Sequence, residues 1–147
     1  MTVDGELLGR DSFEPLIPHS GSMCLLDRVV AWKEDMLWAE SSTHLRADNP
    51  LRQDGRIRAV HAIEYGAQGM AVHGGLLARA TGEPLQGGYL AAIREARFHC
   101  RYLHDLDEPL SVSVWREYAQ AGNLIYRFEV VAGLSPVADG KAIVVAT

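Results

Sequence analysis

The segment from Ile57 to Thr81 restricts the fold most, because it is the one long stretch with helical character. Gly82 follows it as a stop signal and Pro84 lies just beyond. One apolar face is marked by Ile63, Ala67, Met70 and Leu77. The segment also contains Gly66, Gly69, Gly74 and Gly75. Each glycine costs about 1 kcal/mol relative to alanine inside a helix, a cost that is tolerated where the helix backbone must be approached closely. We therefore expect a helix wrapped by a curved sheet.

Strand-like segments lie on both sides of this helix. Met23–Trp32 and Met36–Leu45 predict a hairpin with a turn at residues 33–35, and the polar residues 46–56 predict a loop. The strands expected after the helix are Gly88–Leu103, Pro109–Tyr118, Asn123–Val131 and Lys141–Ala146, the last entered through a turn at Asp139-Gly140. This order predicts an α+β fold with a mostly antiparallel sheet.

Alternation along one of these strands assigns its two faces. Val112 and Val114 fall on one face, which we expect to contact the helix. Ser111, Ser113 and Trp115 fall on the other.

Length and composition predict one domain, residues 1–147. The chain has 147 residues, of which 48% are hydrophobic and 22% charged, as in a folded domain with its own core. The net charge of −5 argues against general nucleic-acid binding. Cys24 and Cys100 have no zinc-type spacing, so we expect reduced cysteines and neither metal nor cofactor. With no signal peptide and no membrane-length apolar run, we expect a cytoplasmic protein outside the membrane.

Three motifs occur in an order typical of one family. LIPHSGSMCLLDRV (residues 16–29) resembles the N-terminal motif of bacterial hotdog-fold 3-hydroxyacyl-acyl-carrier-protein dehydratases. AIEYGAQ (residues 62–68) resembles their central-helix motif, and YLAAIREARF (residues 89–98) resembles the strand after that helix. The resemblance covers most of the chain from Glu14 to Val114 and is nearest to the fatty-acid and aryl-polyene-type branch.

This resemblance implies a hotdog fold, in which an antiparallel sheet wraps around one long central helix. It implies a homodimer, or a heterodimer with another hotdog subunit, whose sheets join edge to edge. The acyl tunnels would lie at that interface and draw residues from both subunits. The implied substrate is a thioester of acyl carrier protein or of coenzyme A.

Dehydration of a 3-hydroxyacyl thioester needs a base for the C2 proton, an acid for the leaving hydroxyl and donors for the carbonyl. Glu64 matches the family's helix acid. A carboxylate inside an apolar helix is expected to have a raised pKa, which suits a proton donor; the alternative is a solvent-exposed Glu64 without a role. Gln68, one turn later, is expected to orient Glu64 or join the dimer, with a structural role favoured.

The family's G-H-F-P motif before the helix is missing. Residues 49–60 (NPLRQDGRIRAV) contain no histidine, and the family histidine falls near Pro50. His61, one turn before Glu64, is the first candidate to replace it. His44 is expected to be a solvated strand end that could swing in, and His19 to make local hydrogen bonds. Structural or exposed positions are expected for His73, His99 and His104.

Substrate-binding groups are expected near the helix start and on the strand after it. The backbone N–H groups of Ala59 and Val60 fall at the family's helix N-terminus, where such groups polarise the thioester carbonyl. Arg56 and Arg97 belong to two arginine-rich segments that suit an acidic carrier protein and its phosphate. Ordinary solvated charge is the alternative.

Three functions fit these residues. The first is a dehydratase that forms a 2-enoyl thioester with Glu64 and a relocated histidine. The second is a non-catalytic hotdog subunit that completes an active partner, which the missing histidine favours over a conventional enzyme. The third, an acyl thioesterase, is disfavoured by the N-terminal and strand motifs. We expect a dehydratase-like protein.

Overall fold

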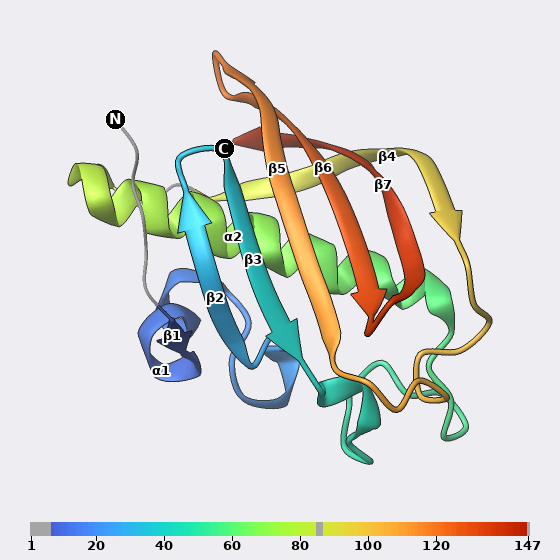
Figure 1. Ribbon diagram of the computed structural model, residues 1–147. Coiled ribbons are helices and arrows are strands. Elements are labelled where there is room, and N and C mark those ends of the chain that lie inside the picture. Colours follow the sequence, from blue (N-terminus) through green and yellow to red (C-terminus); the bar gives the residue numbers. More distant parts are fainter. Residues whose placement is uncertain (1–6, 85–86, 147) are drawn as a thin grey trace.

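One antiparallel sheet of seven strands wraps around a single long helix (Figure 1). The computed structural model describes residues 7–84 and 87–146. The strand order is β1-β2-β3-β5-β6-β7-β4. The strands are β1 (Leu8–Gly9), β2 (Arg28–Lys33), β3 (Met36–Ser41), β4 (Gly88–Phe98), β5 (Leu110–Gln120), β6 (Asn123–Ala132) and β7 (Ser135–Ala146). The helices are α1 (Arg10–Phe13) and α2 (Ala62–Thr81), with short 3-10 turns η1 (Glu14–Leu16), η2 (Gly21–Met23), η3 (Thr43–Leu45) and η4 (Ala59–His61). The predicted α+β fold around one long helix is confirmed.

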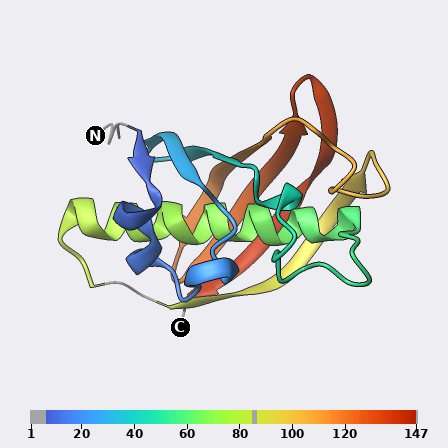
Figure 2. The same cartoon turned by 90° about the horizontal axis from the view of Figure 1, so that it is seen from below.

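The glycines of α2 explain how the sheet approaches the helix so closely. A Cβ atom added at Gly66 would lie 3.1 Å from Cδ2 of Phe128, and one added at Gly69 would lie 3.2 Å from Cγ1 of Val114. At Gly75, an added Cβ would lie 2.8 Å from Cβ of Leu16, in the N-terminal turns packed beside α2 (Figure 2). The predicted close approach is therefore present at three of the four glycines. At Gly74 an added Cβ would meet nothing within 4 Å.

The buried face of α2 differs from the predicted one. Tyr65, Val72 and Leu76 are buried together with Gly66, Gly69 and Gly75, and Met70 is also buried. The other residues predicted for this face are only half-buried: Ile63, Ala67 and Leu77. The pattern of apolar residues therefore identified only one side of the buried face. Glycine is not counted as an apolar residue in such a pattern, although glycines of α2 pack against the core.

The end of α2 is as predicted. Gly82 adopts a left-handed conformation with φ of 73°. The N–H of Glu83 donates to the carbonyl of Ala78 and that of Gly82 to the carbonyl of Arg79. These bonds occupy carbonyl groups that the last helical turn leaves without partners.

Four strand boundaries differ from the prediction by four or more residues. β3 ends at Ser41 instead of Leu45 and β4 ends at Phe98 instead of Leu103, and two strands begin at other residues than expected. β2 begins at Arg28 because the backbone at Met23 and Leu25 binds the side chain of Gln68 instead of a neighbouring strand. β7 begins at Ser135, so the expected turn at residues 139–140 is wrong. Pairing with β6 on one side and β4 on the other holds this dipeptide in extended conformation.

The predicted register of β5 is confirmed. Val112 and Val114 are fully buried, and both lie near Gly69 of α2. Ser113 and Trp115 lie on the outer face and are half-buried. The guanidinium of Arg127 stacks over the indole ring of Trp115, 4.0 Å from its centroid.

Within residues 7–84 and 87–146, β4 pairs only with β7 and so forms one edge of the sheet. Apolar side chains on this strand are exposed to solvent, including Tyr89 at 55% and Phe98 at 39%. Pairing with β7 is interrupted between Arg94 and Arg97, where Glu95 has φ of 54°. An apolar edge of this length is an open template for pairing with another strand.

Candidate functional site

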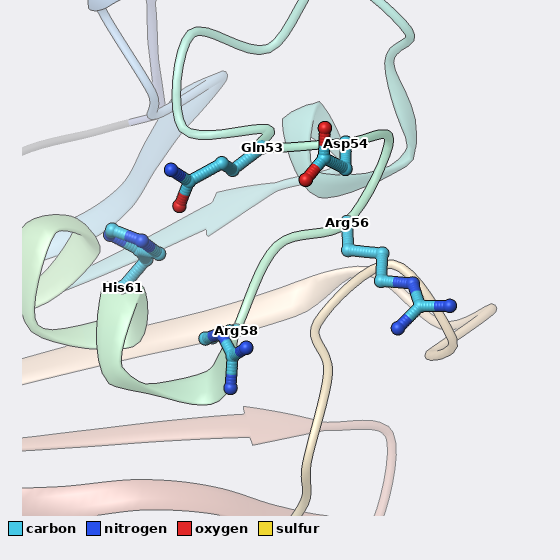
Figure 3. A pocket seen from close by; sticks show the side chains of 5 residues that line it. All are labelled: Gln53, Asp54, Arg56, Arg58 and His61. Atoms are coloured by element: carbon cyan, nitrogen blue, oxygen red, sulfur yellow. The ribbon is translucent and has the colours of Figure 1, made fainter.

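A pocket of about 520 Å³ opens at the start of α2. Its lining residues are Gln53, Asp54, Arg56, Arg58 and His61 (Figure 3). The ring of His61 and the side chain of Gln53 face each other, whereas Arg56 points toward the loop after β4. With two arginines and a single carboxylate, the lining suits an anionic ligand.

The loop that forms one wall of this pocket is fixed by Arg52. Its guanidinium donates to the carbonyl oxygens of His44, Arg46 and Gly55. Asp54 and Gly55 both have positive φ, as in the tight two-residue turn that joins Gln53 to Arg56. The wall is therefore ordered before any ligand arrives.

The opposite wall is an extended segment, residues 56–58, that leads through η4 into α2. Ile57 and Ala59 are buried, and Arg56 and Arg58 are exposed on the pocket side. The guanidinium of Arg56 lies 5.6 Å from the ring centroid of Tyr102. This alternation presents both arginines to the pocket while the segment packs on the core.

The two predicted backbone donors have different surroundings. The N–H of Ala59 donates to the carbonyl of Arg101 at 3.0 Å, so this group is committed to the fold. Val60 is 49% exposed at the mouth of the helix. Of the two groups, only the N–H of Val60 remains a predicted donor to the thioester carbonyl.

Glu64 and His61 lie one turn apart at the start of α2. The apolar sequence around Glu64 had led us to expect a carboxylate enclosed by apolar side chains. In the single subunit Glu64 is instead exposed, in the first turn of α2. His61 is half-buried and lines the pocket. The two side chains therefore border the same open end of the helix.

Gln68 has a structural environment. Its Nε2 donates to the carbonyl of Met23, and its Oε1 accepts from the N–H of Leu25, both at 2.7 Å. These bonds fix the N-terminal motif against α2. Both ends of the amide are used, which leaves Glu64 without orientation by Gln68.

The other histidines are engaged away from the pocket. His44 is fully buried with its Nε2 2.8 Å from the carbonyl of Leu106, and burial lowers its pKa. The expected solvated strand end is therefore wrong. His73 is buried between the hydroxyl of Tyr126 and the carbonyl of Lys33. The side chain of His19 is half-buried, but in the described part of the chain its buried Nδ1 has no hydrogen-bond partner, so the expected local bond is absent at this atom.

A structural network stands where the family histidine would fall. Asn49, beside Pro50, donates from Nδ2 to the carbonyl of Thr43 and to the hydroxyl of Tyr65. Burial raises the pKa of Tyr65, although hydrogen bonds from Thr43 and Asn49 oppose this shift. The loop that carries chemistry in the family is used here to satisfy buried polar groups.

Arg97 does not reach the pocket. Its Nε donates to Oδ1 of Asp139, and Nε2 of His99 lies 2.9 Å from Oδ2 of the same carboxylate. Asp139 faces the outer side of the sheet, because the adjacent Gly140 faces the buried ring of Phe128. Hydrogen bonding from His99, aided by Arg97, lowers the pKa of Asp139.

Gln53 and Asp54 could not be identified as pocket residues from the sequence. Asp54-Gly55 signalled a loop, but only the packing of that loop on the helix start brings these side chains next to His61. In residues 7–84 and 87–146, no group of three or more His, Cys, Asp or Glu side chains is placed to hold a metal ion. Within the same ranges, no helix has the length and apolar character to cross a bilayer.

The model of the ApeP-like family, described as ApeP dehydratase, matches residues 12–147. The chain belongs to the ApeP-like dehydratase family. The predicted resemblance to hotdog dehydratases is thereby confirmed. No curated protein sequence matches this ApeP-like chain.

Solved structures share the fold of the ApeP-like chain. The dehydratase heterocomplex ApeI:P from Xenorhabdus doucetiae matches with a TM-score of 0.82 and 18% identity, covering 92% of this chain and 90% of that one. A sigma28-regulated virulence protein from Campylobacter jejuni matches at 0.57 and 10% identity, covering 95% and 93%. The fluoroacetyl-CoA-specific thioesterase FlK matches at 0.55 and 11%, covering 77% and 85%. At these identities the matches establish the hotdog fold and leave the chemistry to the site.

Proposed function

We propose that this chain is one subunit of a hotdog dehydratase that removes water from a 3-hydroxyacyl thioester and leaves the 2-enoyl thioester. The observation that carries the proposal is the pocket at the start of α2, which His61 lines, with Glu64 exposed one turn further along the same helix. Family membership supports dehydration over thioester hydrolysis.

Each group in this proposal has one task. His61 takes the proton from C2, and Glu64 donates a proton to the departing C3 hydroxyl. The N–H of Val60 stabilises the negative charge that develops on the thioester carbonyl. Arg56 and Arg58 bind the phosphate on the prosthetic arm of an acyl carrier protein or on coenzyme A.

We infer that a second hotdog subunit completes this site across β4. No other strand of the described part of the chain pairs with this edge, and its exposed apolar side chains are costly to leave in water. The partner would also cover Glu64, which is exposed in the single subunit. The similarity to a dehydratase heterocomplex supports a non-identical partner. Light scattering of the purified chain tests this: Leu90→Lys should shift any dimer to monomer, and a parent that stays monomeric with and without other hotdog proteins contradicts the inference.

A non-catalytic role within such a complex is the second candidate. It is favoured by the absence of histidine from residues 49–60 and by the burial of His44, which removes one replacement. In that case the partner provides the proton-transfer groups, and this chain provides the fold and the basic pocket.

Turnover of a 3-hydroxyacyl carrier protein decides between these functions. The chain is incubated with this substrate alone and with hotdog proteins encoded beside it, and the enoyl product is measured. Glu64→Gln should lower the rate by ~100-fold or more, the usual scale for loss of a general acid. Glu83→Gln, which removes an exposed carboxylate beyond the far end of α2, is the matched control and should have no effect. Full activity of Glu64→Gln in the competent complex would leave the non-catalytic role.

A further inference from the structure

The segment that carries Arg56 and Arg58 is held by a short antiparallel ladder with residues 101–103. Arg58 is bridged to Tyr102. The N–H of Ala59 donates to the carbonyl of Arg101 at 3.0 Å, and the N–H of Leu103 donates to the carbonyl of Ile57 at 2.8 Å. This ladder fixes the entry into α2.

One bond of this ladder is made by a side chain. In a regular antiparallel pair, Ile57 and Leu103 would exchange both N–H···O bonds. Here the carbonyl of Leu103 accepts from the N–H of Leu106, in a turn. The N–H of Ile57 donates instead to Nδ1 of His104, at 3.0 Å. The imidazole therefore takes the place of a main-chain carbonyl.

This bond has a requirement that a carbonyl would not have. Nδ1 accepts a hydrogen bond only while it carries no proton, so the His104 ring must be neutral with its hydrogen on Nε2. Nε2 lies 3.4 Å from Oδ1 of Asp105, which orients this tautomer. On protonation, Nδ1–H and the N–H of Ile57 would face each other as two donors. Ile57 is fully buried, so water would not readily replace the lost acceptor.

We propose that His104 is a positioning residue that holds the helix start and its two pocket arginines in place only while its imidazole is neutral. One consequence, weaker substrate binding in acid, rests on the proposed function. An imidazole is the side chain that changes charge between about pH 5 and pH 8, so the effect falls in a range in which the protein can be assayed.

The charges around His104 act in both directions. The carboxylate of Asp105 favours the protonated ring. Arg56, which stacks on Tyr102, opposes protonation, since the Tyr102 ring lies 5.2 Å from that of His104. The N–H of Ile57 opposes it as well, because its dipole points at Nδ1.

Hydrogen exchange at the Ile57 amide tests the bond without any substrate. Exchange is measured at pH 7.5 and 5.5 and corrected for its intrinsic pH dependence. In the parent, protection should fall on the order of 10-fold in acid, the scale for losing one partner of a buried N–H. His104→Asn places Oδ1 where Nδ1 lies and cannot titrate, so its Ile57 protection should fall in acid no more than that of other core amides, which follow the global loss of stability. The control is His99→Asn, on the outer face of the sheet, which should behave as the parent does. Equal protection in the parent, or the same loss in His104→Asn, would overturn the proposal.

The kinetics of dehydration test the positioning role. KM should rise between pH 7.5 and 5.5 in the parent, and His104→Asn should remove this rise while keeping the KM of the parent at pH 7.5. The same pH profile of KM in both proteins would refute positioning, whatever the amide does. If the amide responds as expected and no hotdog complex turns over substrate, the bond to His104 stands and the proposed function fails.

Discussion

Replacing Gly66 with alanine tests how closely the sheet approaches α2. The new Cβ would lie 3.1 Å from Cδ2 and 3.2 Å from Cγ of Phe128, which is closer than carbon atoms normally pack. The ring is fully buried and also lies against Gly140, where an added Cβ would be 3.0 Å from Cε1. It therefore has little room to retreat, and overpacking of this kind costs about 1–3 kcal/mol. Alanine regains about 1 kcal/mol of helix propensity, so we expect net destabilisation of up to about 2 kcal/mol.

Gly74→Ala is the matched control, because an added Cβ there meets nothing within 4 Å. It should raise the free energy of unfolding by about 1 kcal/mol. The propensity gain is the same in both variants, so the difference between them measures the overpacking cost alone, about 1–3 kcal/mol. Urea unfolding gives both values, and each kcal/mol should move Tm by about 2–4 °C. Equal stabilisation of the two variants would refute the close approach at Phe128.

Three further outcomes follow from the same structure. Val112→Asp should unfold the protein because it buries an unpaired carboxylate, whereas Ser113→Asp on the outer face should be milder; equal melting temperatures would contradict the register of β5. Burial lowers the pKa of His73, so below about pH 6.5 the unfolded chain binds a proton at this side chain more readily than the folded chain does. The free energy of unfolding should therefore decrease as the pH falls below about 6.5, by up to about 1.4 kcal/mol per pH unit from this group. Above about pH 6.5 this group should cause no change. Urea unfolding at pH 7.5 and 5.5 measures this, and an unchanged slope in His73→Gln would count against it. Arg56→Glu should weaken binding of an acyl carrier protein more than Arg97→Glu does, because Arg97 is held by Asp139 on the outer face. Added salt should also weaken binding to the parent protein. An affinity that does not respond to salt would contradict the role of the basic pocket.

The course of the main helix and the faces of β5 followed from the sequence because both depend on neighbours in the chain. Helix α2 ends where a glycine adopts a left-handed conformation, and the strand faces follow from simple alternation. The ordered motifs identified the family for the same reason, since each is a local string that needs no knowledge of contacts. The predicted helix start at Ile57 was wrong: residues 57–59 pair with residues 101–103 and α2 begins at Ala62, which is why Glu64 lies in its first turn.

Contacts between distant segments decided the rest. Asp139 and Gly140 read as a turn by themselves, but β6 and β4 hold them in the middle of a strand. His44 read as a strand end in solvent, and it is buried because the loop at Leu106 packs over it.

The candidate site shows the same division. Its residue types were visible in the sequence, whereas their availability depended on partners more than 40 residues away along the chain, such as Arg101 for the N–H of Ala59 and Asp139 for Arg97. A hydrogen bond to a distant group leaves no local pattern of hydrophobicity or turn chemistry, so no reading of neighbouring residues finds it. The sequence by itself determined the elements and the family, and the tertiary structure decided which polar groups were free to act, because burial and pairing are properties of the packed chain.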